Sequence, residues 1–447
     1  MTTIAIHNGH VVDPALGLDG IADVVIVDGR VARIGPNEGD AVIDAERIDA
    51  SGLVVSPGFV DLHTHLREPG FEYKETIKTG TLAAARGGYT TICAMPNTSP
   101  ALDSRAAVES VLREADASAL VRVLPIGTIT MGRKGKELSP QGELRDAGVV
   151  ALSDDGDAVG DASLMRHALE YSTQFGLPVA QHCEEPSLVK DGHMHEGWVA
   201  TRLGLRGRPA SAEETLVARD IALASLVGAH LHICHVSTAG SVALIAAARD
   251  RGARVTAEVT PHHLTLTHEE VAFASDYVHV QYNTNAKVNP PLREEADLEA
   301  LAVALRDGII DAIATDHAPH ASTDKDVEFD LAASGLTMLE TSFGLSMRLV
   351  HAGKIGLPAL IERMTIGPVR AWRLDERPGL QGLGTLAPGA LGDVALLDPS
   401  AEWTVDPATF ASKGKNTPLA GRTLTGLVVA TIAGGRLVHE TERMVAL

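Results

Sequence analysis

The hydrophobic positions of this chain fall into short runs that recur along residues 54–320, and each run ends in polar residues. The runs are apolar or β-branched, and segments of Ala, Leu, Glu and Arg with helical spacing separate them. The eight runs are "VVSPGFVDLHTH", "GYTTICAMPN", "VRVLPIGTIT", "GVVALSDDG", "LPVAQHCE", "AHLHICHVS", "ARVTAEVTPHH" and "IIDAIATDHAPH". Strands of this kind that alternate with helices are typical of a parallel sheet buried on both faces. Eight such units predict an α/β protein built on a (β/α)8 TIM-type barrel.

Two of the intervening segments show the helical pattern clearly. Val217, Ile221, Ala224 and Gly228 are spaced three or four residues apart, which places them on one face of a helix. "SVALIAAARDRG" ends in a basic turn, and Gly252 is the expected C-cap before the next strand. We therefore expect helices here that pack on the sheet.

The two ends of the chain have a different pattern. Residues 1–56 contain "TIAIHNGHVVDP" and "ADVVIVDGRVARIG", and residues 385–447 contain "LGDVALLDP" and "VVATIAGGRLVHE". These are short strands with Gly or Asp-Gly turns. We expect both ends to pair into one small β-sandwich domain, which the barrel domain of residues 57–384 interrupts.

Composition narrows the classes of partner. The chain has 38 basic and 58 acidic residues, a net charge of −20, and no stripe of Lys or Arg that would follow a phosphate backbone, so nucleic acid is not an expected partner. Cys93, Cys183 and Cys234 lie in apolar runs and cannot make a disulfide framework. Buried thiols in a reducing cytosol are expected.

Neither an export signal nor a membrane span is expected. The N-terminal "MTTIAIHNGHVVDP" lacks a basic segment before an apolar core. Residues 221–248 carry no Asp, Glu, Lys or Arg, but three histidines and two glycines interrupt them, which favours a helix, a buried strand and a second helix. The expected location is the cytoplasm.

Most of the runs end in side chains that can bind a metal ion. His63 and His65 are one residue apart, so on an extended strand they point the same way and can reach one ion. The ends of later runs carry Asp155, His182, His235 and Asp316. In the predicted barrel these ends meet at one opening, and imidazole with carboxylate is the ligand set of zinc or a similar divalent ion.

Six ligands exceed the three that one catalytic zinc takes from a protein, so two ions are expected. A carboxylate can bridge ions roughly 3.5 to 4 Å apart, and metals lower the pKa of bound water to about 7. A hydroxide between the ions would then be a nucleophile at neutral pH. The expected reaction class is hydrolysis of a carbonyl or phosphoryl compound.

Arg67 lies two residues beyond His65 and is expected to point into the same opening. Its planar guanidinium suits a substrate carboxylate, and Asn97 on the next strand can add a hydrogen bond. The alternative is a surface ion pair between Arg67 and Glu68 or Glu72.

Eight short motifs of this chain resemble those of a known enzyme family. "DLHTHLREPG", "AMPNTSP", "LSDDG", "AQHCEE", "CHVSTAGS", "AEVTPHHL", "KVNPPLR" and "ATDHAPH" occur in order over nearly the whole chain. Together they resemble bacterial class I dihydroorotases, members of the amidohydrolase superfamily. The resemblance implies a zinc-dependent enzyme that reversibly closes N-carbamoyl-L-aspartate to dihydroorotate in pyrimidine biosynthesis. It also implies a homodimer and, among relatives, association with aspartate transcarbamoylase.

The resemblance further implies roles for individual residues. Two zinc ions per chain would be bound by His63, His65, Asp155, His182, His235 and Asp316, with Asp155 as the bridge. Substrate contacts would fall on Arg67, Asn97, Asn289, His320 and Gly335. A bridging hydroxide would attack the ring amide carbonyl, and Asp316 would pass its proton to the leaving nitrogen. In the reverse direction Asp316 would deprotonate the carbamoyl amide.

Two features set this chain apart. Hydantoinases, dihydropyrimidinases and allantoinases bridge their metals with a carbamylated lysine on the fourth strand, whereas "GVVALSDDG" has no lysine and offers Asp154 or Asp155. Strand alternation sends these two aspartates opposite ways, and the family pattern favours Asp155. The family's "PFG" loop, whose backbone helps to hold substrate, is here "LAASGL" at residues 331–336, which keeps Gly335 without the preceding aromatic residue.

Other readings stay open on the sequence alone. An amidase for another carboxylated ring, such as a hydantoin or allantoin, is the second enzyme hypothesis. A non-catalytic partner of aspartate transcarbamoylase is the third, although the complete ligand set argues against it. His193 and His195 share the metal-like spacing, but we expect them in a solvated loop. One of His262 and His263 is expected to face the opening.

Overall fold

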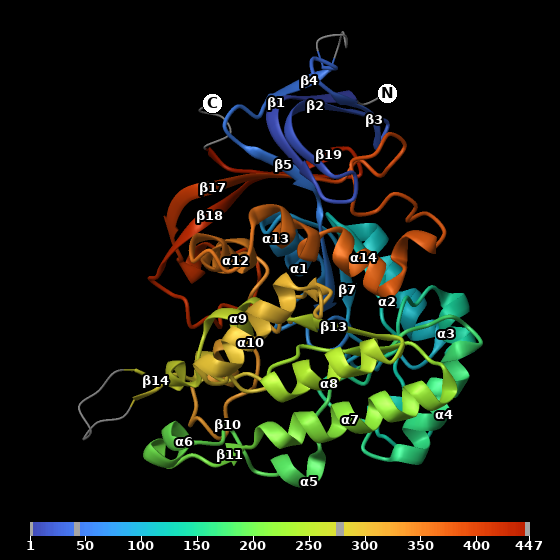
Figure 1. Cartoon of the computed structure of the whole chain (residues 1–447), viewed down its shortest axis with the longest axis vertical. Coiled ribbons are helices and arrows are strands. Elements are labelled where there is room, and N and C mark those ends of the chain that lie inside the picture. The colour runs from blue at the N-terminus through green and yellow to red at the C-terminus, as the bar shows by residue number, and fades with distance from the viewer. Residues whose placement is uncertain (1–2, 40–44, 274–280, 443–447) are drawn as a thin grey trace.

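A computed structural model describes residues 3–39, 45–273 and 281–442 of this chain. A sheet built from both ends of the chain lies at one end of the molecule, and a larger α/β body lies below it (Figure 1). Both parts contribute to the candidate site, which lies within the α/β body.

The α/β body contains short parallel strands in two hydrogen-bonded groups. One group has the order β6-β7-β8 and the other has the order β16-β13-β12-β9. The strands are β6 (Phe59–Thr64), β7 (Tyr89–Ala94), β8 (Arg122–Pro125), β9 (Val179–Gln181), β12 (Leu231–Ile233), β13 (Val255–Val259) and β16 (Ala312–Ile313). Their side chains are nearly all buried, as expected for strands covered on both faces.

The fourth predicted strand is not a regular strand. Within "GVVALSDDG" only Leu152 makes bridges, which are parallel and join it to Gly127 beyond β8 and to Val179 in β9. Another parallel bridge joins Thr64 at the end of β6 to His317 beyond β16. The pairings therefore run from β6 through β8, Leu152, β9 and β16 back to β6.

Helices follow these strands in the chain. They include α1 (Ile77–Arg86), α2 (Arg105–Ser118), α3 (Gln141–Ala147), α4 (Ala162–Thr173), α7 (Ala210–Val227), α8 (Ala239–Asp250), α10 (Glu295–Arg306), α12 (Ser342–His351), α13 (Leu357–Met364) and α14 (Ile366–Trp372). The predicted face of α7 is confirmed, because Val217, Ile221 and Ala224 are buried. Gly252 has a φ of +80° and lies one residue beyond the cap of α8, Arg251. No helix in the described ranges is both long and apolar enough to cross a membrane.

The two chain ends share one sheet of eight strands. Its order is β19-β18-β17-β5-β1-β2-β3, with β4 on β1. The strands are β1 (Thr3–Asp13), β2 (Leu18–Val27), β3 (Arg30–Gly35), β4 (Glu46–Asp49), β5 (Val54–Pro57), β17 (Val394–Thr404), β18 (Thr423–Ala433) and β19 (Arg436–Glu440). The two chain ends are thus joined in a single hydrogen-bonded sheet, in which β5 and β17 pair antiparallel.

The first predicted run is divided between the two parts of the molecule. β5 belongs to the terminal sheet and β6 to the α/β body, with Gly58 between them. A Cβ at Gly58 would lie 2.3 Å from Thr90 Cγ2, so the tight passage from one sheet to the other requires glycine.

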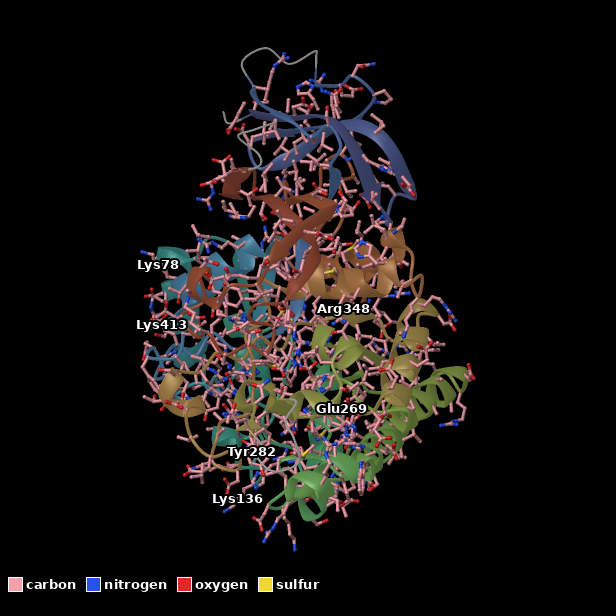
Figure 2. The ribbon with its side chains drawn as sticks, turned by 90° about the vertical axis from the view of Figure 1, so that its left-hand side faces the viewer. Lys78, Lys136, Glu269, Tyr282, Arg348 and Lys413 are labelled. Atoms are coloured by element: carbon pink, nitrogen blue, oxygen red, sulfur yellow. The ribbon has the colours of Figure 1, made fainter. Side chains whose placement is uncertain are left out.

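The connection between β17 and β18 extends from the terminal sheet to the α/β body. Lys413 in this connection is labelled beside the body in Figure 2, away from the terminal sheet. Asn416 accepts a hydrogen bond from His320 N (2.8 Å) and donates to Gly335 O (3.0 Å). A segment assigned by sequence to the terminal domain therefore helps to build the candidate site.

Candidate metal centre and substrate cavity

The six predicted metal ligands lie at the carboxyl ends of the parallel segments. The end of β6 carries His63 and His65, and the residues after Leu152, β9, β12 and β16 carry Asp155, His182, His235 and Asp316. All six side chains are buried. Residues that are up to 253 positions apart in the chain therefore reach one place because the carboxyl ends of parallel strands share one edge.

Asp155 lies at the centre of the group. Its Oδ2 is 3.3 Å from His63 Nε2 and 3.4 Å from His65 Nε2. Its Oδ1 is 3.3 Å from His235 Nε2 and 3.5 Å from His182 Nδ1. One carboxylate thus faces two pairs of imidazoles, one pair on each oxygen.

Asp316 closes the group on the side of β6. Its Oδ1 lies 2.9 Å from His65 Nε2 and 3.5 Å from His63 Nε2. His63, His65 and Asp316 form one set of potential ligand atoms within 4.8 Å of one another, and His63, Asp155 and His235 form another. The two sets share His63.

The two neighbouring aspartates of the fourth segment point to different partners. Asp154 accepts hydrogen bonds from the backbone N–H groups of Ile129 (2.8 Å) and Thr130 (3.1 Å) and from the Thr130 hydroxyl. Asp155 faces the histidines instead. Of the two aspartates that the sequence left open, Asp155 is therefore the one that faces the histidines, and its role as the shared ligand stays a prediction.

The charges within the cluster balance one another. Burial raises the pKa of Asp155, but His63 and hydrogen bonds from His182 and His235 hold it well below its usual range. Burial opposes protonation of His182 as well, yet Asp155 and Glu184 raise its pKa to about 10. The carboxylates thus favour positive charge at His182, which is the charge that a divalent cation would supply.

Two further residues orient the potential ligands. Glu258 in β13 lies with Oε1 2.7 Å from His63 Nδ1, and Asn97 Oδ1 accepts a hydrogen bond from His65 Nδ1 (2.9 Å). With each Nδ1 satisfied, Nε2 is the nitrogen left for a metal. His63 Nε2 is buried and forms no hydrogen bond with the described residues, which fits a ligand atom.

Sequence reasoning missed Glu258, and it also missed Asp61. Asp61 accepts hydrogen bonds from His63 N (3.0 Å), Thr315 N (3.0 Å) and the Thr315 hydroxyl, so it joins the backbones that present His63 and Asp316. The available signal was a carboxylate inside an otherwise apolar run, "FVDLH" and "TAEV". A charged residue at such a position needs a buried partner.

A cavity of about 280 Å³ opens beside the cluster. It is lined by four of the potential ligands, His65, Asp155, His182 and Asp316, and by every predicted substrate contact, namely Arg67, Asn97, Asn289, His320 and Gly335. Asn289 donates to Glu184 Oε2 (3.1 Å) and to His182 Nε2 (3.2 Å), so it is fixed next to the cluster. Gly335 has a φ of +131°, and a Cβ there would lie 2.6 Å from the Cβ of Ala318.

Arg67 is the cation of this cavity. Its Nε donates to Pro319 O (3.3 Å), and its Nη2 lies 3.4 Å from His320 Nε2. Burial lowers the pKa of the Arg67 guanidinium to about 10, so it stays charged at neutral pH. The alternative of an ion pair with Glu68 or Glu72 is not seen, since Glu68 accepts from Ile77 N and Glu72 accepts from Gly70 N instead.

Two further histidines, His195 and His262, are buried outside the six potential ligands. His195 was expected in a solvated loop, but it is buried in β10 (Met194–His195) beside His268 and Glu294. Arg293 donates to His195 Nδ1 (3.1 Å), which places a cation against this second group. His262 is fully buried and neither ring nitrogen has a partner among the described residues.

Comparison with known proteins places this arrangement in a family. Residues 52–241 match the family model described as Dihydro-orotase-like. The chain is 52% identical over 438 residues to a dihydroorotase of Anaeromyxobacter dehalogenans (strain 2CP-1 / ATCC BAA-258), covering 98% of each chain. It is also 52% identical over 438 residues to a dihydroorotase of Pelotomaculum thermopropionicum, again over 98% of each chain. This chain belongs to the dihydroorotase family.

Solved structures extend the dihydroorotase family assignment to a wider fold group. The L-hydantoinase (dihydropyrimidinase) of Arthrobacter aurescens superimposes with a TM-score of 0.85 at 25% identity, covering 98% of this chain and 96% of that one. A dihydroorotase family member thus shares its overall fold, terminal sheet included, with another cyclic amidohydrolase. The earlier resemblance to dihydroorotases is confirmed.

Proposed function

We propose that this protein is a metal-dependent dihydroorotase that interconverts N-carbamoyl-L-aspartate and dihydroorotate. The observation that carries the proposal is that one cavity contains both the Asp155 cluster and the Arg67 guanidinium. The cluster supplies ligands for hydrolytic metal chemistry, and Arg67 supplies a partner for a substrate carboxylate. Similar curated proteins are named dihydroorotase, which supports dihydroorotate, a cyclic amide, as the substrate.

The donor set fits zinc at two positions. Four imidazoles and two carboxylates are typical zinc ligands. His63 Nε2 forms no hydrogen bond with the described residues, and Glu258 and Asn97 hold the Nδ1 atoms of His63 and His65. Bound zinc would lower the pKa of a water and polarise the amide carbonyl. Asp155, with one oxygen facing each histidine pair, would be the shared ligand.

The protein's own groups would position the substrate and move one proton. Arg67 would bind the substrate carboxylate, with Asn97, Asn289 and His320 around the ring and the backbone at Gly335 closing the cavity. Asp316 would accept the proton of the attacking water and deliver it to the leaving nitrogen. Its pKa is held far below the usual range by His63 and His65 in spite of burial, so it is ionised and ready to act as a base.

The proposal includes an architecture. The closed circuit of parallel pairings supports a (β/α)8 barrel over residues 57–384, with the cluster at its carboxyl-terminal opening. The eight-stranded terminal sheet supports one small domain formed from residues 1–56 and 385–447.

The test is an assay of purified protein in both reaction directions together with metal analysis of each chain. We expect turnover of dihydroorotate and N-carbamoyl-L-aspartate and close to two zinc ions per chain. Hydantoin, dihydrouracil and allantoin serve as comparison substrates. Turnover of one of these without turnover of dihydroorotate would replace the proposed substrate, and a metal-free chain that zinc does not activate would support the non-catalytic reading.

A further inference from the structure

Two buried lysines lie outside the metal cluster and beside the substrate cavity. Lys325 ends α11 (Ser322–Lys325), and Lys287 follows the 3-10 helix η3 (Thr284–Ala286). Each residue is only 5% exposed. Neither ammonium forms an ion pair with a carboxylate of the described residues, which is unusual for buried charge.

Both ammonium groups bind main-chain carbonyls. Lys325 Nζ donates to Ala333 O (2.6 Å), Thr284 O (3.1 Å) and Lys287 O (3.4 Å). An ammonium has three donors, so all three are used. Lys325 therefore ties the segment of residues 329–335 to the chain at residues 284–287.

Lys287 makes the same connection from the opposite side. Its Nζ donates to Phe329 O (2.7 Å) and Asp330 O (2.9 Å), while its own carbonyl accepts from Gly335 N (2.9 Å). The 329–335 segment is thus attached near both ends, at Phe329 and at Gly335. No regular helix or strand is assigned within it to hold its carbonyls.

The held segment forms part of the cavity wall. Ser334 and Gly335 line the cavity, and Ser334 O accepts a hydrogen bond from His320 Nε2 (2.9 Å). This segment contains residues 331–335 of the "LAASGL" stretch. A shift in its backbone would move His320, and His320 Nε2 lies 3.4 Å from Arg67.

The lysines are held there at an energetic cost. Burial lowers the pKa of Lys325 to about 7 and that of Lys287 to about 8, so the environment disfavours both charges. Apolar side chains would avoid this cost but would leave several buried carbonyls without donors.

We propose that Lys325 and Lys287 are positioning residues that hold the 329–335 segment against the cavity and so set the affinity for the carboxylate substrate. This inference rests on the proposed dihydroorotase function. The lysines act through the segment and through His320, without contacting the metal cluster.

The experiment compares Lys325→Met and Lys287→Met with the unchanged protein, with kcat and KM measured in both reaction directions. We expect KM to rise on the order of tenfold while kcat and zinc content change less than about threefold, because ground-state positioning is lost and the metal cluster is kept. Lys415→Met is the control for loss of a carbonyl-bound ammonium, on an exposed residue. Lys415 also donates to two main-chain carbonyls, those of Phe410 and Ser412, but it does not touch the 329–335 segment.

The outcomes separate this inference from the proposed function. An unchanged protein without dihydroorotase activity would refute the function itself. An active protein whose two lysine variants keep KM unchanged, or whose Lys415→Met variant raises KM equally, would overturn the inference. If Lys325→Met does not fold, Lys287→Met decides, because it removes two donated bonds instead of three.

Discussion

Three carboxylates surround the imidazole ring of His63. Asp155 Oδ2 lies 3.3 Å from its Nε2, Asp316 Oδ1 lies 3.5 Å from the same atom, and Glu258 Oε1 lies 2.7 Å from its Nδ1. Burial lowers the pKa of His63, but these three acids together raise it well above its usual value. At this residue a proton and a metal ion therefore compete for the same nitrogen.

Asp316 is the residue whose replacement tests the proposed chemistry directly. Asp316→Asn keeps the size and one ligand oxygen but removes the base. We expect turnover to fall by a factor on the order of 10² or more, with substrate affinity nearly unchanged. Steady-state kinetics with metal analysis checks this, and near-normal turnover at full metal content would remove Asp316 from its role.

Glu258 is expected to act through His63. Glu258→Gln keeps the shape but removes the charge that fixes the Nδ1 proton, so we expect zinc affinity to fall by roughly 10 to 100-fold. Competition with a chelator of known affinity measures this. Glu340→Gln is the control, because Glu340 binds the backbone N–H groups of Ala411 and Ser412 and does not touch His63. Equal losses in both variants would point to general destabilisation.

At the scale of elements, the ends of strands carry the site and buried polar residues hold those ends in register. Asp61 joins β6 to the segment after β16, and Asp154 joins the fourth segment to residues 129–130. At the opposite, amino end of β12, the partly buried His230 is bound to the neighbouring strand β13 through Thr256 Oγ1 (2.9 Å). Such contacts fix neighbouring strands more specifically than apolar packing alone.

His230 makes a prediction about pH and stability. Burial lowers its pKa to about 3, whereas an unfolded histidine titrates near 6.5. Between these values the unfolded chain binds the extra proton, so stability must fall as pH decreases from about 6.5 toward 3. His230→Gln should reduce the slope of the unfolding free energy by up to ~1.4 kcal/mol per pH unit.

Urea unfolding at several pH values measures this slope for the unchanged chain and the variant. His167→Gln is the control, because His167 is exposed on α4 and should leave the slope unchanged. An unaltered slope in His230→Gln would show that His230 is protonated in the folded state.

At the scale of the whole molecule, the candidate site joins parts of the chain that lie far apart. Asn416 from the connection between β17 and β18 holds Gly335 and His320, and the terminal sheet joins β5 to β17. The body and the terminal sheet should therefore unfold together. The expected homodimer and the association with aspartate transcarbamoylase concern other chains and stay predictions.

Removal of the metal ions should lower both the activity and the stability of the folded chain. Two buried aspartates of the cluster, Asp155 and Asp316, have pKa values held low by the surrounding histidines in spite of burial, so they bring negative charge that a cation would balance. A metal that binds only the folded chain stabilises it by ~2.7 kcal/mol at a free concentration of a hundred times Kd. We expect chelation to abolish activity and lower the melting temperature, and zinc to restore both. Calorimetry with and without chelator checks this, and an unchanged melting temperature would contradict it.

The sequence alone allowed part of the site to be predicted because periodicity and strand ends are local properties. The spacing of His63 and His65 placed both on one face, and the alternation of runs placed the other ligands at the same edge. The fourth run did not form the strand expected, since only Leu152 bridges its neighbours. Glu258 and Asn416 act on partners that are 81 or more positions away in the chain. Lys325 binds several main-chain carbonyls that converge only in the folded protein. No local sequence pattern encodes these contacts.

The order of motifs in the sequence therefore determined the family, the type of metal ligand and the edge at which the ligands gather. Only the tertiary structure decided that Asp155 faces the histidines while Asp154 binds a turn, that a segment of the C-terminal part completes the cavity, and that two buried lysines fix its wall. The physical reason is that residue types and spacing follow from the chain itself. Which buried polar group meets which partner depends on how distant segments pack.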